Sequence, residues 1–204
     1  MADDQTFRII LALGMAVFVP VGLYHRIHSQ ATREPLDRRQ EGLFILFTLR
    51  PFGLAAMGGM VLFIVNPAWM AWSSVPLPVS LRWVGVAIGV PTLVLGILTF
   101  RSIGTNITDT VVTRREHTLV TTDPYRFVRH PFYTTSFCGF LANALTTANW
   151  FLALTGAIAL PLIVIRTATE EAHLVKRFGD DYQRHMERTG RFFPRLGSLQ
   201  ATRT

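Results

Sequence analysis

The stretch FYTTSFCGFLANALTTANWFLALTGAIALPLIVI, residues 132–165, decides the fold class of this chain. It is largely apolar and contains no charged residue. A single helix of this length would reach about 50 Å, well beyond the roughly 30 Å hydrocarbon core of a bilayer. The run Thr146-Thr147-Ala148-Asn149-Trp150 in its middle is polar, as turns are. The stretch therefore predicts two short membrane helices, over residues 132–147 and 150–166, joined by a hairpin.

Three further apolar runs, over residues 7–24, 43–65 and 81–100, lie upstream of this pair. Each is close to the length of about 20 residues that a membrane-spanning helix needs. Half of the 204 residues are hydrophobic and only 16% are charged, so the chain lacks the polar surface of a soluble domain. We predict an all-α, polytopic protein with five transmembrane helices, in which residues 1–204 form a single membrane domain.

The positive charge of the chain, +7 in total, is unevenly placed. Most Lys and Arg residues fall in residues 25–42, 101–131 and 166–204, whereas residues 66–80 and 146–150 hold no charged residue. This alternation is what the positive-inside rule predicts for five spans with an external N-terminus and a cytoplasmic C-terminus. Basic residues on that side also favour anionic lipid headgroups. We expect an integral protein of a bacterial inner membrane, whose partners include membrane lipids and exclude nucleic acid; the oligomeric state is left open.

Two isolated residues inside the predicted helices bear on possible chemistry. The single cysteine, Cys138, cannot form an intrachain disulfide or a thiolate metal cluster, and we predict no metal site. Arg50, beside Pro51, is a charge inside a predicted span, which normally faces a partner or a wet cavity. It either meets a substrate anion or a carboxylate such as Glu170, or extends to the membrane interface, and the sequence leaves both interpretations open.

The segment HTLVTTDPYRFVRHPFY, residues 117–133, is a polar and aromatic turn that runs into a predicted membrane helix. Pro131 suits the first turn of that helix, where its missing N–H is harmless. Arg129 and His130 then lie at the helix entrance, where backbone N–H groups and the helix dipole attract anions. The segment therefore predicts a binding point for a carboxylate.

A second segment, EEAHLVKRFGDDY over residues 170–182, continues the last predicted helix out of the membrane and is followed by Arg191-Phe192-Phe193-Pro194. Its adjacent carboxylates, Glu170 and Glu171, suit a cation. An amino acid head group needs both a basic and an acidic partner, and Tyr125 and Tyr133 could contact a purine or a ribose. The alternative is a juxtamembrane charge cluster that only determines topology.

The order of these motifs resembles that of the isoprenylcysteine carboxyl methyltransferase and phospholipid N-methyltransferase superfamily. The pattern R-H-P-x-Y, then E-E-x-x-L-x-x-x-F-G-x-x-Y, then R-x-x-P is matched over roughly residues 100–195. The matching residues are Arg129, His130, Pro131, Tyr133, Glu170, Glu171, Leu174, Phe178, Gly179, Tyr182, Arg191 and Pro194. The chain departs from the pattern at Asp123 and Thr135, where glycine is usual, and at His185, where tyrosine is common.

The resemblance implies an S-adenosylmethionine pocket that faces the cytoplasm, formed by the C-terminal helices and loop. The residues implied in cofactor binding are Gly104, His117, Leu119, Val120, Tyr125, His130, Pro131, Tyr133 and Glu170. Arg129 and Arg191 are implied on the acceptor side. Glu171, His130 and His173 are the candidates to assist deprotonation of an amine or thiol. Arg129, Arg191 and Glu171 form the expected catalytic set.

The function expected from this resemblance is methyl transfer to a membrane-embedded or hydrophobic acceptor. A prenylcysteine-like carboxylate, a phospholipid amine and a small thiol are all compatible, so the acceptor atom is O, N or S. One alternative is an NAD(P)H-dependent membrane sterol or steroid reductase, against which the run His-Pro-Phe-Tyr-Thr-Thr from His130 counts. The other is a non-catalytic membrane protein.

Overall fold

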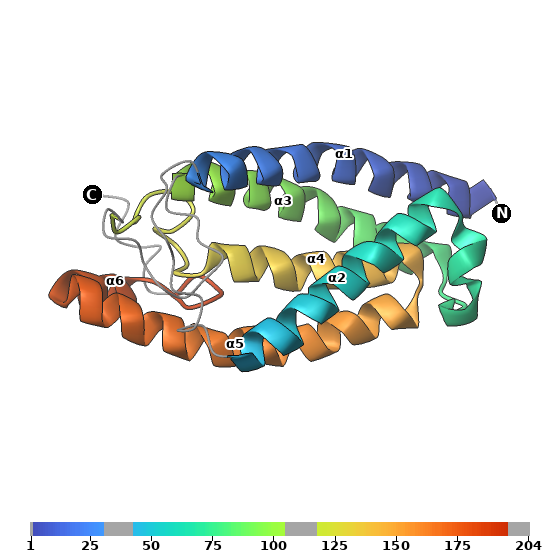
Figure 1. Cartoon of the computed structure of the whole chain (residues 1–204). Helices are drawn as coiled ribbons and strands as arrows, with labels where there is room; N and C mark the ends of the chain where they lie inside the picture. Colours follow the sequence, from blue (N-terminus) through green and yellow to red (C-terminus); the bar gives the residue numbers. More distant parts are fainter. Residues whose placement is uncertain (1, 31–42, 105–117, 196–204) are drawn as a thin grey trace.

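The computed structural model describes residues 2–30, 43–104 and 118–195, and these residues form an all-helical fold without a named strand (Figure 1). The prediction of an all-α fold is therefore confirmed for this part of the chain. The elements in chain order are α1 (Ala2–Gln30), α2 (Leu43–Val65), the 3-10 helix η2 (Pro67–Ser73), α3 (Val79–Ile103), α4 (Pro131–Thr147), α5 (Trp150–Phe178) and α6 (Asp180–Arg188).

The five long helices pack as a bundle, with α3 against α4, α1 against α3, and α2 across α5. Three of them, α1, α3 and α5, are long and apolar enough to cross a membrane. In α2, the described apolar part is the shorter stretch Leu49–Val65, and α4 has 17 residues. Large apolar side chains such as Leu54 and Leu13 are exposed on the bundle surface, which is typical of a surface that faces lipid. The five-span count stays a prediction.

A tight turn joins α4 to α5 within residues 146–150, the run for which the sequence predicts a hairpin. α4 ends at Thr147, Ala148 adopts the left-handed conformation (φ 50°), and α5 begins at Trp150. Asn149 caps α5 by accepting a hydrogen bond from the Leu152 N–H (3.2 Å), and its amide donates to the Ser73 hydroxyl of η2 (2.8 Å). One buried side chain therefore begins α5 and fastens η2 to the turn.

Close contact between α3 and α4 depends on small residues of α3. A Cβ on Gly85 would lie 2.7 Å from the backbone nitrogen of Thr146, so only glycine fits there. A Cβ on Gly96 would lie 3.1 Å from the side chain of Thr135. Thr135, one of the departures from the superfamily pattern, is accommodated in this structure by a glycine on the facing helix.

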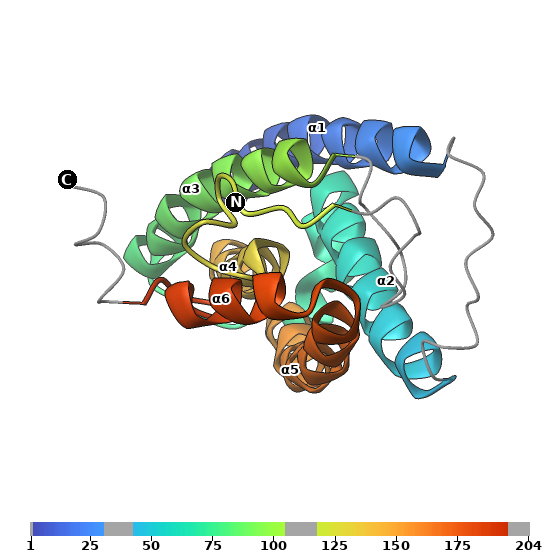
Figure 2. The same cartoon turned by 90° about the vertical axis from the view of Figure 1, so that its left-hand side faces the viewer.

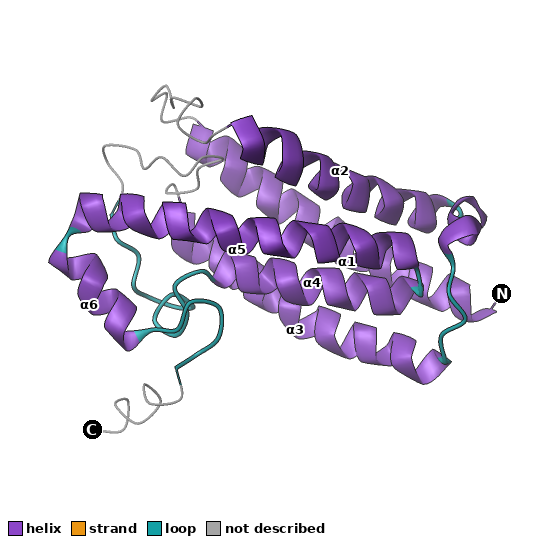
Figure 3. Cartoon of the chain, turned by 90° about the horizontal axis from the view of Figure 1, so that it is seen from below, coloured by secondary structure: helices purple, strands orange, loops and turns teal. Residues whose placement is uncertain are grey.

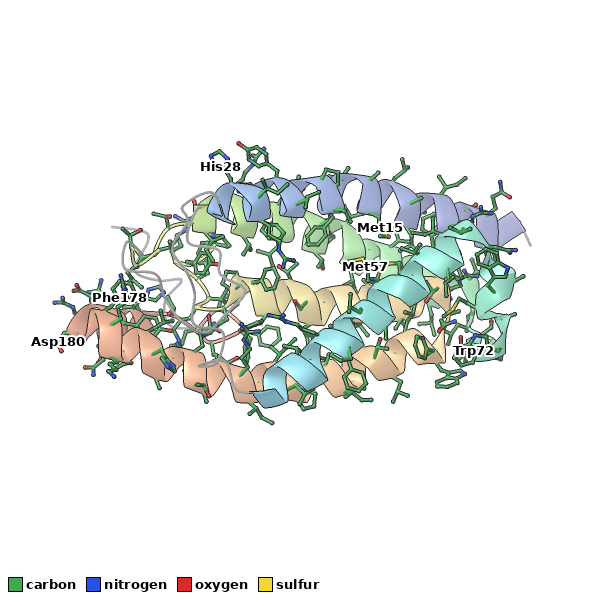
Figure 4. The ribbon with its side chains drawn as sticks, in the orientation of Figure 1. Met15, His28, Met57, Trp72, Phe178 and Asp180 are labelled. Atoms are coloured by element: carbon green, nitrogen blue, oxygen red, sulfur yellow. The ribbon has the colours of Figure 1, made fainter. Side chains whose placement is uncertain are left out.

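The bundle has two distinct ends, which Figure 4 marks with labelled residues. His28, Phe178 and Asp180 lie at one end, together with α6 and the start of α4; we call it the site end. Trp72 lies at the other, the hairpin end, where Val75 N–H donates to the Ala148 carbonyl (2.8 Å).

The buried Arg82 ties three helices together at the hairpin end. Its guanidinium pairs with Asp4 of α1 (2.8 Å), donates to the Thr146 carbonyl of α4 (3.0 Å) and lies over the Phe7 ring (4.1 Å). A charge within a predicted span is thus used as a clamp between α1, α3 and α4.

Candidate functional site

The candidate site is formed where three segments meet at the site end: the turn before α4, the last turns of α5, and the tail that follows α6 (Figure 3). Pro131 is the first residue of α4, as predicted, and it is fully buried. The tail runs beside the turn, because the Arg129 N–H donates to the Gly190 carbonyl (2.9 Å) and the His130 N–H donates to the Arg191 carbonyl (3.1 Å). The tail is therefore held over the entrance of α4.

Gly190 makes this approach possible. A Cβ at this position would lie 1.7 Å from the Phe193 carbonyl oxygen, inside any allowed contact. The tail also bonds to α4 itself, since the Thr134 hydroxyl donates to the Phe192 carbonyl (2.6 Å). Sequence reasoning named neither Gly190 nor Thr134, although a glycine directly before Arg191 was the available signal.

Glu171 is buried at the centre of the site and receives hydrogen bonds from three cationic or protonatable side chains. Its Oε1 lies 3.0 Å from Arg129 Nε and 3.2 Å from His130 Nε2. Arg191 donates to both carboxylate oxygens, from Nε (3.3 Å) and from Nη2. Two guanidinium charges thus face one carboxylate, which compensates the cost of burying it.

Arg129 also donates to backbone carbonyls at the end of α6. Its Nη1 bonds to the carbonyl of Met186 (3.1 Å) and to that of Thr189. The basic helix entrance was predicted to attract a carboxylate, and the carboxylate that the structure places there is the protein's own Glu171. The predicted basic and acidic groups therefore partly neutralise each other.

Glu170 has a different environment from its neighbour. Its side chain is 28% exposed, and its Oε2 accepts a hydrogen bond from the Tyr133 hydroxyl (2.7 Å). Its Oε1 lies 4.0 Å from Nδ1 of His130, whose ring stacks on that of Tyr133 (centroids 5.5 Å apart). Burial, and then the negative charge of Glu170, raise the pKa of the Tyr125 hydroxyl above its ordinary value. Tyr125, His130 and Tyr133 therefore lie around the Glu170 carboxylate. Among the described residues, no ion pair joins this carboxylate to an arginine.

The α6 helix lies across the site end of the bundle, in front of α4 and beside α5 in Figure 2. Its amphipathic pattern buries Tyr182 and His185, and Gly179 with a φ of 54° makes the sharp turn out of α5. Burial first, and then the electrostatic influence of Arg129, lower the pKa of His185. His185 therefore contributes a neutral ring to the packing near neutral pH.

The remaining predicted site residues are placed less closely. Gly104 ends α3 with a φ of 53°, and its N–H donates to the Phe100 carbonyl. Leu119 and Val120 are half-buried in the segment before the turn. His117 lies outside the described residues.

A helical bundle with membrane-length apolar helices and a charged cluster at one end defines an integral membrane protein. Comparison with family models then assigns it: the model for phospholipid methyltransferase matches residues 80–181, half of the chain. The chain belongs to the phospholipid methyltransferase family. The match spans the helix pair α3 and α4, the turn, and α5 up to the start of α6.

Three relatives are similar to part of the chain. The chain is 34% identical over 91 residues to the nickel-cobalt-cadmium resistance protein NccN of Alcaligenes xylosoxydans xylosoxydans, covering 45% of this chain and 43% of that one. It is 34% identical over 94 residues to the cobalt-zinc-cadmium resistance protein CzcN of Cupriavidus metallidurans, covering 45% and 42%. It is 35% identical over 75 residues to the protein-S-isoprenylcysteine O-methyltransferase of Schizosaccharomyces pombe, covering 36% and 32%.

Each of these similarities covers less than half of the relative's own length. Two of the relatives are named for metal resistance. In residues 2–30, 43–104 and 118–195 of this chain, no group of three or more His, Cys, Asp or Glu residues is arranged to hold a metal ion.

Proposed function

We propose that this protein is an S-adenosylmethionine-dependent methyltransferase that acts on a membrane-embedded or hydrophobic acceptor. The observation that carries the proposal is the unequal pairing of two adjacent carboxylates. Glu171 is paired with Arg129 and Arg191, whereas Glu170 bonds to a tyrosine hydroxyl and keeps its charge available. A partly exposed carboxylate beside aromatic rings suits a cationic nucleoside. Membership of the phospholipid methyltransferase family supports the same reaction class.

The residues around Glu170 fit the parts of this cofactor. Glu170 would bind the ammonium group, and Tyr125, His130 and Tyr133 offer aromatic faces and hydroxyls for the adenosine. Gly104, His117, Leu119, Val120 and Pro131 complete the proposed cofactor side, with Pro131 fixing the start of α4 and hence the position of His130. When bound, S-adenosylmethionine supplies a methyl group on a cationic sulfonium.

The proposed acceptor side consists of Arg129, Glu171 and Arg191. The Arg129 side chain is 10% exposed, and with Glu171 it positions the tail. The Arg191 side chain is 40% exposed and can direct an N–H group toward the methyl acceptor. Glu171 accepts hydrogen bonds on both oxygens, which makes it an orienting group rather than a strong base. The dry helix bundle would favour a reaction in which charge is dispersed, and positioning would supply most of the acceleration.

We further propose that all five long helices span the membrane, with the site end cytoplasmic and the N-terminus external, in a bacterial inner membrane. The acceptor would be a prenylcysteine-like carboxylate, a phospholipid amine or a small thiol. Its apolar part would enter sideways from the bilayer. The similarity to an isoprenylcysteine O-methyltransferase supports a carboxylate acceptor. Membership of the phospholipid methyltransferase family supports an amine acceptor equally.

The test is ligand-dependent thermal stabilisation of the purified protein in detergent. We expect S-adenosylhomocysteine to raise the unfolding temperature in a concentration-dependent way, and NADPH to leave it unchanged. Stabilisation by NADPH alone would favour a reductase, and stabilisation by neither would favour a non-catalytic protein.

A further inference from the structure

Phe193, in the tail that follows α6, is a large apolar side chain that is 62% exposed. Its ring packs edge-on against the ring of Phe137 on α4, with the two centroids 6.3 Å apart. Phe137 is itself exposed, and it shares one face of α4 with the exposed Leu141, one turn further along. The tail therefore extends the apolar outer surface of α4 at the edge of the candidate site.

The packing of α4 on α3 shows how deep this contact lies in the bundle. A Cβ on Gly85 would meet Thr146, and a Cβ on Gly96 would meet Thr135. The two glycines are as far apart along α3 as the two threonines are along α4, so the helices run antiparallel and in register over this length. The level of a residue of α4 can therefore be compared with that of a residue of α3.

In this register Arg101, exposed near the site end of α3, is level with His130 at the entrance of α4. The helix α3 is long and apolar enough to cross a membrane, and no charged residue lies between Arg82 and Arg101. Arg101 therefore marks the polar boundary at this end of the bundle. Phe137 lies about 10 Å inside that boundary, level with Val94, which is 53% exposed on α3.

The backbone of the tail enters the same apolar layer. The Arg191 carbonyl accepts a hydrogen bond from the His130 N–H at the boundary, and the Phe192 carbonyl accepts one from the Thr134 hydroxyl, about 6 Å further in. A carbonyl among acyl chains has no water to bond and needs such a donor. Arg195 then donates to a backbone carbonyl of α6, so the tail turns back toward the polar side.

We infer that the tail dips into the bilayer at the site end, so that the Phe193 ring lies among lipid acyl chains while Arg191 and Arg195 stay at the level of the headgroups. Lipid is the partner that fits, because Phe193 continues an exposed apolar surface at a depth where α3 exposes Val94. The two arginines that flank Phe193 suit anionic headgroups.

The inserted tail also determines the depth of the acceptor side of the site. Arg191 pairs with Glu171 and belongs to the tail, so lipid contacts of Phe193 would hold this arginine at the boundary between headgroups and acyl chains. This consequence rests on the proposed function, whereas the insertion of the tail does not.

Fluorescence quenching in vesicles tests the insertion. Phe193→Cys, Val94→Cys and Asp180→Cys, each in a Cys138→Ala background, are labelled with a small thiol-reactive fluorophore and reconstituted into phosphatidylcholine vesicles. One quencher is phosphatidylcholine with a nitroxide on its acyl chain, and the other is iodide on both sides of the membrane. We expect the nitroxide lipid to quench position 193 about as strongly as position 94, and iodide to quench only the exposed position 180.

Quenching of position 193 by iodide, as at position 180, would place the tail in water and overturn the inference. Protection of position 193 from both quenchers would also overturn it, because another protein surface, such as a second copy of the chain, would then cover Phe193. Neither quencher involves a cofactor, so these outcomes are independent of methyl transfer.

A label at position 193 can displace the tail, so a second measurement uses the unmodified protein in the same vesicles. Hydroxyl radicals generated in water oxidise side chains that water reaches. Phe193 should escape oxidation despite its exposure, as should Leu54 of α2, which is 73% exposed. Oxidation of Phe193 while Leu54 is protected would contradict the insertion of the tail.

Discussion

Glu170 and Glu171 are adjacent in the chain, yet they face different partners, and this contrast can be tested directly. Glu170→Gln removes the charge proposed to bind the ammonium, so the affinity for S-adenosylhomocysteine should fall at least tenfold while the ligand-free protein keeps its stability. Glu171→Gln is the matched control: it leaves Arg129 and Arg191 without a counter-charge and should cost about 3 kcal/mol of unfolding free energy, the lower end for a buried pair because Arg191 is partly exposed.

Calorimetry with S-adenosylhomocysteine and denaturant titration of the same two preparations would measure these effects. If the cofactor affinity of Glu170→Gln lies within threefold of that of wild type, Glu170 does not bind the cofactor and has a structural role or only contacts solvent.

Arg191 separates the acceptor side of the proposed site from the cofactor side. Because Arg191 is placed on the acceptor side in this account, Arg191→Ala should leave S-adenosylhomocysteine affinity within about threefold while lowering turnover, since only the acceptor loses its orientation. Arg191→Lys should restore little, because a point charge does not replace the planar fork that reaches both oxygens of Glu171.

The comparison needs cofactor titration and turnover on one preparation of each variant. Equal losses in both quantities would move Arg191 into the cofactor site, and no loss in either would leave it a lipid contact.

The residues of the site were largely predictable, but their pairing was not. The motifs around Arg129, Glu170 and Arg191 could be read from their order and spacing. The sequence could not show that Glu171 takes both arginines, since that depends on how α4, α5 and the tail are placed relative to one another.

At the scale of elements, the α4–α5 turn depends on Asn149. Its side chain caps α5 and bonds to both Ser73 and the Met70 carbonyl of η2. Asn149→Ala should therefore lower the unfolding free energy by about 2 kcal/mol, the upper end for loss of a helix cap. Asn149→Ser, which keeps an oxygen for the cap, should recover part of this loss.

Chemical denaturation in detergent measures the stability of both variants. Because the turn lies at the hairpin end, S-adenosylhomocysteine affinity should not change, and a loss comparable to that of Glu170→Gln would contradict the separation of the two ends.

Helix positions were predicted well where a polar break or a proline marked them, as at Pro131 and at residues 146–150. Elsewhere the observed helices are longer than the predicted spans: α1 covers residues 2–30 instead of 7–24, and α5 continues to Phe178. Membrane hydropathy marks only the apolar part of a helix, whereas the backbone hydrogen bonds continue into polar sequence until a residue such as Gly179 ends them. The separate α6 was not predicted for the same reason.

At the scale of the whole molecule, the proposed topology requires the turn before α4 and the start of α6 to lie on one side of the membrane. Single cysteines at Arg126 and Asp180, both exposed at the site end, and at Ser74, exposed at the hairpin end, would report this in a Cys138→Ala background. We use Ser74 because Ala148 is only 5% exposed.

An impermeant thiol reagent applied to intact cells should label the cysteine at position 74, and should label those at positions 126 and 180 only after the membrane is opened. Labelling of 126 and 180 from opposite sides would refute the five-span arrangement.

The central claim is methyl transfer from S-adenosylmethionine at the site end, and transfer of a radiolabelled methyl group tests it most directly. Membranes containing the wild-type protein, Glu170→Gln or Tyr24→Phe would be incubated with methyl-labelled S-adenosylmethionine, and the organic-phase products separated and identified. We predict a labelled hydrophobic product with wild type and with Tyr24→Phe, reduced at least tenfold with Glu170→Gln. Equal amounts of label in the organic phase for Glu170→Gln and for wild type would contradict the claim. So would an amount of label with wild type that does not exceed the amount found with membranes lacking the protein.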